Sequence, residues 1–399
     1  MNGLDSLFIN LKAWILDLPW IPEKALPLVS MAVSISAILM VFPFLFAMTT
    51  VVERKLLGRI QNRYGPNRVG PFGFLQWAAD GIKTLTKENV VPRSADKIVH
   101  FLAPLALLCP VLLAFSIIPF GRNMTPIELD AGLLFFFAVG AGTELAVFMA
   151  GWSSRNKYSL LGSMRAVAQM ISYEMPLLLS AISVVMMVGS MNLNDIVAAQ
   201  SEFSGWIPNW HVLTPWGLLG CFIFLIAAMA ESNRSPFDLP EAESEIIAGY
   251  FVEYSGMKFA LFFLGEYMGL FVMGGLWITL FFGGWQAPLP FEWLQWFPSW
   301  GWFILKLTAL IFFFIWTRGT LPRVRTDQLM ALAWKFLLPL SLFNLVVAGL
   351  WRFSSEVAVI GQVVRWTLGF GLVFVLYVAF GSQFGTGRRF ARRTYKYVD

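Results

Sequence analysis

The residues best suited to proton chemistry are carboxylates crowded between positions 231 and 258. The stretch holds a single arginine, Arg234, and an aromatic residue, Phe237, stands beside the acids. Its carboxylates are Glu231, Asp238, Glu241, Glu243, Glu245 and Glu253. Because like charges at this spacing disfavour each other's ionisation, the group is expected to bind and release protons as a coupled set.

Two simpler explanations account for part of this cluster. Asp238 and Glu241 fit a capping box, with Pro240 in the first turn of the following helix, and acids are favourable at a helix start. A solvated acidic face would also tolerate Glu241 and Glu245 four residues apart. Neither explanation accounts for the number of acids, so a titrating cluster is the favoured interpretation.

A second set of ionisable residues interrupts long apolar stretches. These residues are Glu144, Glu174, Glu266 and Lys306. A charge at the centre of a membrane helix costs about 2.5 to 3.5 kcal/mol on insertion scales, so each must be neutral, paired or in contact with water. Local pairing that only holds helices together is the structural alternative. The functional interpretation is a proton path through the membrane domain.

Composition explains which elements must position these groups. The 399 residues are 57% apolar and 13% charged, with a net charge of +5, and the mean hydropathy is +0.67. A soluble domain carries about twice that share of charge. These values exclude a soluble enzyme, a disordered regulator and a coiled coil, and they indicate an all-α polytopic membrane protein forming one membrane domain.

Nine stretches are long and apolar enough to be transmembrane helices. They are residues 25–52, 101–120, 131–154, 166–194, 214–230, 259–284, 293–317, 328–351 and 357–387. Of the 29 Lys and Arg residues, 23 fall on the side reached after each odd-numbered span, and five fall on the other. The positive-inside rule therefore predicts an outer N-terminus and a cytoplasmic C-terminus.

The first inner loop is predicted to be structured. Residues 61–71 are rich in Gly, Pro and Arg, which favours a shaped turn. Residues 73–88 alternate apolar and polar positions at helical spacing, which predicts an amphipathic helix at the membrane interface. Such a helix could anchor the chain to anionic lipid, or it could form one wall of an opening for a lipid-soluble molecule.

Other kinds of chemistry have no visible residues. Two cysteines, Cys109 and Cys221, exclude a disulfide framework and a Cys-rich cluster, and both are predicted to be inert core residues. His100 and His211 are predicted on opposite membrane faces, which excludes a bis-His haem. No phosphate loop, dinucleotide motif or metal-ligand spacing is present. We therefore expect no catalytic residue, metal or redox centre in this chain.

Several strings resemble one family, the heel subunits of bacterial NADH:quinone oxidoreductase, or respiratory complex I, whose mitochondrial counterpart is subunit 1. The strings cover residues 53–55, 65–71, 73–83, 168–174, 236–249 and 260–267. The resemblance extends from the first span to the eighth. The ninth span and the basic tail have no counterpart in shorter members, so no chemical role is assigned to them.

The resemblance implies a subunit between the membrane arm and the peripheral arm that forms an entrance chamber for quinone, the substrate. The implied chamber residues are Arg54, Arg63, Glu231, Arg234, Phe237, Asp238, Glu241, Glu243 and Glu245. The implied proton path contains Glu144, Glu174, Glu253 and Glu266. Partner subunits would carry NADH, FMN and the iron–sulfur clusters. Membrane lipid is an expected partner, and nucleic acid is not.

The implied location is the bacterial inner membrane, with the mitochondrial inner membrane as the alternative. Three other functions stay open at this point. One is the equivalent subunit of a sister complex, a membrane-bound hydrogenase or a ferredoxin- or F420-dependent dehydrogenase. Another is a stand-alone ion transporter, against which the absence of internal repeats argues. The last is a structural anchor, against which the buried ionisable groups argue.

Overall fold

The computed structural model describes residues 5–17, 22–238, 249–291 and 294–354, together with 367–369, 371 and 378. This part of the chain is mostly helical, and its strands form a single short antiparallel pair. The helices and strands are α1 (Leu7–Leu16), η1 (Glu23–Ala25), α2 (Leu26–Ile60), η2 (Pro71–Gly73), α3 (Gln76–Thr86), α4 (Lys97–Phe115), α5 (Gly132–Ser153), α6 (Lys157–Val188), α7 (Leu193–Ala199), β1 (Phe203–Ser204), β2 (Ile207–Pro208), η3 (His211–Leu213), α8 (Pro215–Glu231), η4 (Gly249–Phe251), α10 (Gly256–Phe281), η5 (Leu294–Trp296), α11 (Ser299–Thr320), α12 (Thr326–Leu332), the π-helical turn η6 (Ala333–Leu337) and α13 (Leu338–Ser354).

Seven described segments are long and apolar enough to cross a membrane. They are α2, α4, α5, α6, α10, α11 and the continuous segment from α12 to α13. The apolar helix α8 has 17 residues, which is below the length of those seven. The ninth predicted span, residues 357–387, falls almost entirely outside the described residues. A mostly helical fold with seven candidate membrane-spanning segments is therefore shown for the described residues, and the count of nine spans stays a prediction.

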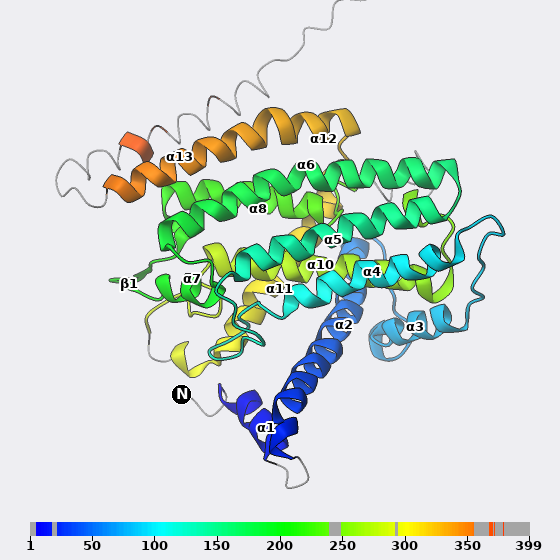
Figure 1. The fold of residues 1–399 in the computed structure, drawn as a ribbon, viewed down its shortest axis with the longest axis horizontal. Helices are drawn as coiled ribbons and strands as arrows, with labels where there is room; N and C mark the ends of the chain where they lie inside the picture. Colours follow the sequence, from blue (N-terminus) through cyan, green and yellow to red (C-terminus); the bar gives the residue numbers. More distant parts are fainter. Residues whose placement is uncertain are drawn as a thin grey trace, which may run out of the picture.

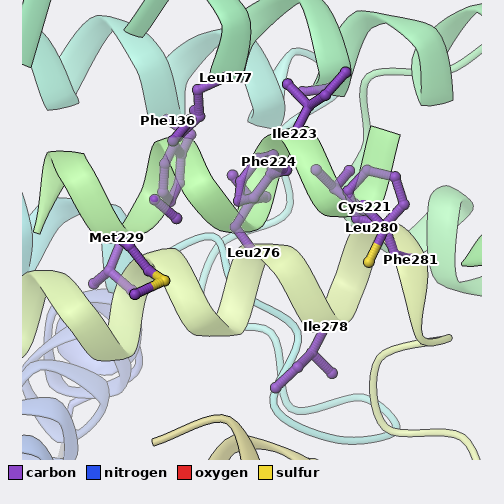
Figure 2. Packing of buried hydrophobic residues seen from close by; sticks show 14 of the residues in the cluster. Phe136, Leu177, Cys221, Ile223, Phe224, Met229, Leu276, Ile278, Leu280 and Phe281 are labelled. Carbon is purple, nitrogen blue, oxygen red and sulfur yellow. The ribbon is translucent and has the colours of Figure 1, made fainter. Parts of the chain in front are cut away.

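The main core lies where α5, α6, α8 and α10 meet. Figure 2 shows Phe136, Leu177, Phe224 and Leu276, one from each of these helices, packed among other apolar side chains. All four are almost fully buried. Close packing of this kind fixes helix positions to within fractions of an ångström, so polar residues on the same helices are held in place as well.

Capping residues set several helix starts. Asp96 accepts from the backbone of Ile98 at the start of α4, and Asn156 accepts from Tyr158 at the start of α6. Asp5 caps α11 from a distant part of the sequence, because its carboxylate accepts from Ser299 N at 2.6 Å. These bonds satisfy backbone N–H groups that a helix start leaves without partners.

Helices α2 and α3 lie at the edge of the bundle. In Figure 1, α2 runs at a steep angle from the bundle toward α1, and α3 lies beside it. A turn at residues 61–75 joins the two, and it needs Gly73, whose φ is +75° and where a Cβ would come within 2.2 Å of Pro66 O. Along α3, Ile82 and Leu85 are exposed. The placement of α3 at a membrane interface stays a prediction.

The cysteines differ in environment. Cys221 is buried in the core, but Cys109 is exposed on α4. The prediction that both are core residues is therefore wrong for Cys109. Apolar periodicity places a residue in a helix of a membrane protein, but it does not decide whether that face meets protein or lipid.

Candidate functional site

A buried ionic cluster links four distant parts of the chain. Glu53, near the end of α2, is 4% exposed. Its carboxylate accepts a short hydrogen bond from Arg318 of α11 and a 2.7 Å bond from the Tyr267 hydroxyl of α10. Arg234, in the loop after α8, lies 3.5 Å from the same carboxylate. We call these four residues the Glu53 cluster. One carboxylate faces two guanidinium groups, so the cluster keeps an excess of positive charge.

Arg234 is the most constrained member of the Glu53 cluster. Its guanidinium lies over the Tyr267 ring, 3.7 Å from the ring centre, a cation–π arrangement. Burial acts to lower the pKa of Arg234, but Tyr267 and Glu53 beside it outweigh burial and raise that pKa above its ordinary value. The side chain is therefore a permanent buried cation.

The loop that carries Arg234 is held by α6. The Gln169 amide donates to the backbone oxygens of Ala230, at 2.8 Å, and Phe237, at 2.7 Å. Phe237 is itself buried, with its ring 5.7 Å from that of Tyr173. Because Gln169 bridges the two ends of residues 230–237, the segment that positions Glu231 and Arg234 is fixed to a packed helix.

Asp238 is the last described residue of this loop. It accepts a 2.9 Å hydrogen bond from Arg323, in the connection between α11 and α12. Val324 N in the same connection donates to Pro236 O. The loop is thus tied to α6 on one side and to the end of α11 on the other.

A cavity of about 570 Å³ lies between α2, α3 and α10. Its lining is mostly apolar and aromatic, and it also includes Arg54, Asp80 and Lys83. Arg54 and Asp80 form an ion pair of 2.5 Å that joins α2 to α3. Tyr267 lines this cavity and also belongs to the Glu53 cluster. One side chain therefore contacts both the cavity and the buried charges.

Three carboxylates from different helices lie close enough to interact electrostatically. They are Glu144 of α5, Glu174 of α6 and Glu231 at the end of α8. We call Glu144, Glu174 and Glu231 the acid triad. One oxygen of Glu144 and one of Glu231 are buried without a hydrogen-bond partner.

A small cavity of about 70 Å³ adjoins the acid triad. Its lining includes Glu231, Asn233, Tyr250 and Glu266. Glu266 accepts a 2.8 Å hydrogen bond from the Tyr250 hydroxyl. This volume has room for a few water molecules, and although most of its lining is apolar, Glu231, Asn233 and Glu266 offer them hydrogen-bond partners. The cavity brings Glu266 of α10 and Glu231 of α8 to one space.

Of the predicted chamber residues that the structure describes, only Arg54 lines the larger cavity. Two predicted site residues lie apart from both cavities and from the loop at residues 231–238. Arg63 is exposed, donates to Gln61 at 2.7 Å and lines neither cavity described above. Glu253 accepts a 2.8 Å bond from Asn156 at the start of α6 and lines neither cavity. Glu241, Glu243 and Glu245 lie outside the described residues.

Sequence reasoning missed several residues of this site. Glu53 lies in a string that resembles the family but was not predicted as a site residue, and Tyr267, Arg318, Asp80 and Gln169 were not predicted either. The available signal was position: Glu53 is the first charge after a long uncharged stretch, and Tyr267 follows Glu266. Their roles depend on contacts across more than 200 sequence positions, which spacing does not reveal.

A metal site would need several ligating side chains close together. Within residues that the structure describes, no group of three or more His, Cys, Asp and Glu side chains could hold a metal ion. Lys306, the fourth ionisable residue predicted inside a span, donates to three backbone carbonyl groups and contacts no member of the acid triad in those bonds.

Comparison with known proteins gives consistent matches. Residues 33–349 match the family described as NADH dehydrogenase. The NADH-quinone oxidoreductase H subunit of Dehalococcoides mccartyi is 54% identical over 296 residues, covering 74% of this chain and 79% of the relative. The same subunit of Geobacillus kaustophilus is 50% identical over 298 residues, covering 74% and 86%. The corresponding protein of Geobacter metallireducens is 48% identical over 324 residues, covering 79% and 94%.

Proposed function

The chain belongs to the NADH dehydrogenase family, that of the NADH-quinone oxidoreductase H subunits, and on this premise we propose that it forms a quinone chamber and couples quinone reduction to proton movement. It acts as a membrane subunit that carries no redox centre of its own. Peripheral-arm subunits bind NADH, FMN and iron–sulfur clusters and deliver the electrons. The other membrane-arm subunits receive the protonation signal.

The cavity of about 570 Å³ is the proposed quinone chamber. Its volume falls within the range of about 300 to 1,000 Å³ usual for small-molecule sites, and its apolar lining with a few polar groups suits a lipid-soluble ring. The position of α3 beside α2, with apolar side chains exposed, supports an opening toward the bilayer. Arg54 and Asp80 form a polar rim on that side.

The proposed coupling starts with charge. A quinone accepts two electrons from the partner subunits and two protons to become a quinol. Negative charge that develops on the ring attracts the positively charged Glu53 cluster, which the cavity reaches through Tyr267 and which includes Arg234. A change at Arg234 alters the electrostatic environment of Glu231, three residues earlier in the same loop.

The acid triad then carries the response into the membrane. Glu144 and Glu174 interact at short range, so a change of charge on one changes the proton affinity of the other. The pair can therefore exchange a proton when the charge at Glu231 changes. Glu266 takes part through the small cavity. Five further residues stay in the proposed site because of the sequence resemblance alone. They are Glu253, Arg63, Glu241, Glu243 and Glu245.

One observation carries this function. Tyr267 lines the larger cavity and also donates to Glu53, which contacts Arg234 in the loop that begins with Glu231. Contacts thus run from the cavity to Arg234, and the chain itself joins Arg234 to Glu231 of the acid triad, three residues earlier.

We also propose that the chain lies in a bacterial inner membrane among lipids, with its N-terminus outside and its C-terminus in the cytoplasm.

The test uses Glu144→Gln and Glu231→Gln in the assembled enzyme. Amide side chains keep size and hydrogen bonding but cannot carry a proton as a carboxyl group does. We expect NADH-driven quinone reduction and proton uptake into proteoliposomes to fall together in both variants. The control is Glu202→Gln, an exposed acid in the loop between α7 and α8. Normal turnover with full pumping in both triad variants would contradict the proposal.

A further inference from the structure

Lys306 is a half-buried residue of α11, and its ammonium lies in a cage of carbonyl groups. Its ammonium donates to Phe282 O at 2.7 Å, Gly284 O at 2.9 Å and Gln286 O at 2.8 Å. Trp210 covers the group, with its ring centre 4.4 Å away. Three acceptors need three N–H donors, which only the protonated amine has. Since carbonyl groups are neutral, the cage satisfies the hydrogen bonds of Lys306 and leaves its positive charge uncancelled.

The turn that follows α10 is shaped to make this cage. Gly283 and Gly284 have φ values of +66° and +55°, and a Cβ on Gly283 would meet Trp210 Nε1 at 2.4 Å. Gln200 Oε1 accepts from Gly283 N at 3.0 Å, and the Gln286 amide donates to Val197 O at 2.6 Å. The turn that carries these carbonyl groups is thus held by contacts from the segment around α7.

The Lys306 ammonium lies well away from the acid triad, toward the predicted outer face. Helix α10 carries Glu266 in its first half and ends at the cage, about 24 Å further along its axis at 1.5 Å per residue. Lys306 lies about 10 Å inside the start of α11 on the same scale. Both helix ends face the side that the charge bias predicts to be outer. A proton that leaves the acids toward that side would approach an uncancelled cation.

We propose that the Lys306 ammonium is an electrostatic seal that stops protons of the acid triad from leaking to the outer face. This inference rests on the proposed function of the triad. A fixed positive charge excludes protons from membrane channels by the same physics. A carboxylate partner would have neutralised the charge, whereas carbonyl groups stabilise it without neutralising it. A lysine that served only to cap the end of α10 would make the same hydrogen bonds. A measurement of proton leak is therefore needed to distinguish a capping role from a sealing role.

The experiment uses the whole enzyme in liposomes, at rest, without NADH. A potassium diffusion potential set by valinomycin drives protons, and an internal pH dye reports their rate. We expect Lys306→Gln to raise the rate about tenfold, because a unit charge about 10 Å away at an effective dielectric constant of about 20 changes a proton's energy by roughly that factor. We expect Lys306→Arg to keep the wild-type rate, and Lys306→Gln combined with Glu144→Gln to restore it.

Several results would overturn the proposal. They are an unchanged leak in Lys306→Gln, a leak that persists in the double variant, and escape of a trapped anionic dye, which would reveal a structural hole. If Lys306→Gln does not assemble, Trp210→Leu keeps the ammonium and its three bonds but lets water screen the charge. That variant should leak faster than wild type, and an unchanged rate overturns the seal. The resting leak is independent of turnover, so its failure is distinct from failure of the coupling proposal.

Discussion

The hydroxyl of Tyr267 donates to Glu53 over 2.7 Å although the two residues are 214 positions apart. The same ring supports the Arg234 guanidinium on its face. Tyr267 therefore contacts an anion through its edge and a cation through its face, which is the arrangement that the quadrupole of an aromatic ring favours. Both charges are buried, so this one side chain fixes the geometry between them.

The hydroxyl of Tyr267 can be removed without removing the ring. We expect Tyr267→Phe to assemble, to keep Arg234 in place and to lower kcat/KM for quinone about tenfold, since a hydrogen bond to a charged group contributes about 1.5 to 3 kcal/mol. Steady-state quinone reduction by the purified enzyme measures this effect. Tyr173→Phe is the matched control, because its buried hydroxyl donates to the neutral Leu329 O and touches neither the cavity nor the Glu53 cluster. Equal losses in both variants would assign Tyr267 a purely structural role.

The membrane fold could be predicted from the sequence because apolar length is a local property. Stretches such as residues 101–120 and 131–154 indicated helices, and the structure has α4 and α5 there. Helix ends were less predictable. The first charged residue after the apolar stretch set the predicted end of the first span at residue 52. Helix α2 nevertheless continues to Ile60 through Arg54 and Lys55, because a helix does not have to end where its apolar stretch ends.

The site could be predicted only in part. A lone acid in an apolar helix stands out, so the sequence predicts Glu144, Glu174 and Glu266 as site residues directly. The sequence could not indicate which acids meet. Glu144 and Glu174 interact at short range, whereas Glu253 is bonded to Asn156, and this difference arises from helix packing. A residue such as Gln169, which acts through two backbone carbonyl groups, has no signature in composition or spacing.

Gln169 gives a second prediction, on stability. Gln169→Leu leaves the buried Phe237 carbonyl without the Gln169 donor, and an unsatisfied group of this kind costs about 1 to 3 kcal/mol, whereas Ala230 O keeps a bond from Asn233 N. We expect the temperature of half-inactivation to fall and quinone reduction to weaken, because the loop carrying Arg234 loses its tie to α6. Ser180→Ala on the same helix is the control, since its hydroxyl donates only within α6. A Gln169→Leu enzyme as heat-resistant as Ser180→Ala would show that the loop is held by other contacts.

The ion pair between Arg54 and Asp80 gives a prediction on substrate access. The Arg54 side chain is 52% exposed, so the pair contributes only about 0 to 1 kcal/mol to stability. We expect Asp80→Asn to leave assembly intact and to change KM for quinone more than kcat, with a difference from wild type that shrinks at high salt. Exchanging the charges, as Arg54→Asp with Asp80→Arg, should restore most of the loss. A change confined to kcat would mean that the pair does not act on quinone access.

His211 gives a prediction on pH. It lies in η3, outside the spans, and burial lowers its pKa from 6.5 to about 4. Because the folded pKa is below the unfolded one, the stabilisation by neutral His211 is complete above pH 6.5 and is lost as pH falls toward 4. The loss is on the order of 3 kcal/mol at most. Replacing His211 by Phe keeps a ring against Trp216 and removes the titration.

The measurement compares Tm of wild-type and His211→Phe enzyme between pH 7.5 and 4.5. Other acids titrate in this range in both proteins, so only the difference between the two curves is informative. We expect the wild type to lose more Tm than the variant as the pH falls through 6.5, and the two curves to run parallel above pH 7. Parallel curves over the whole range would show that His211 gains protons equally well in the folded and unfolded chains, and that water reaches its ring in the folded protein.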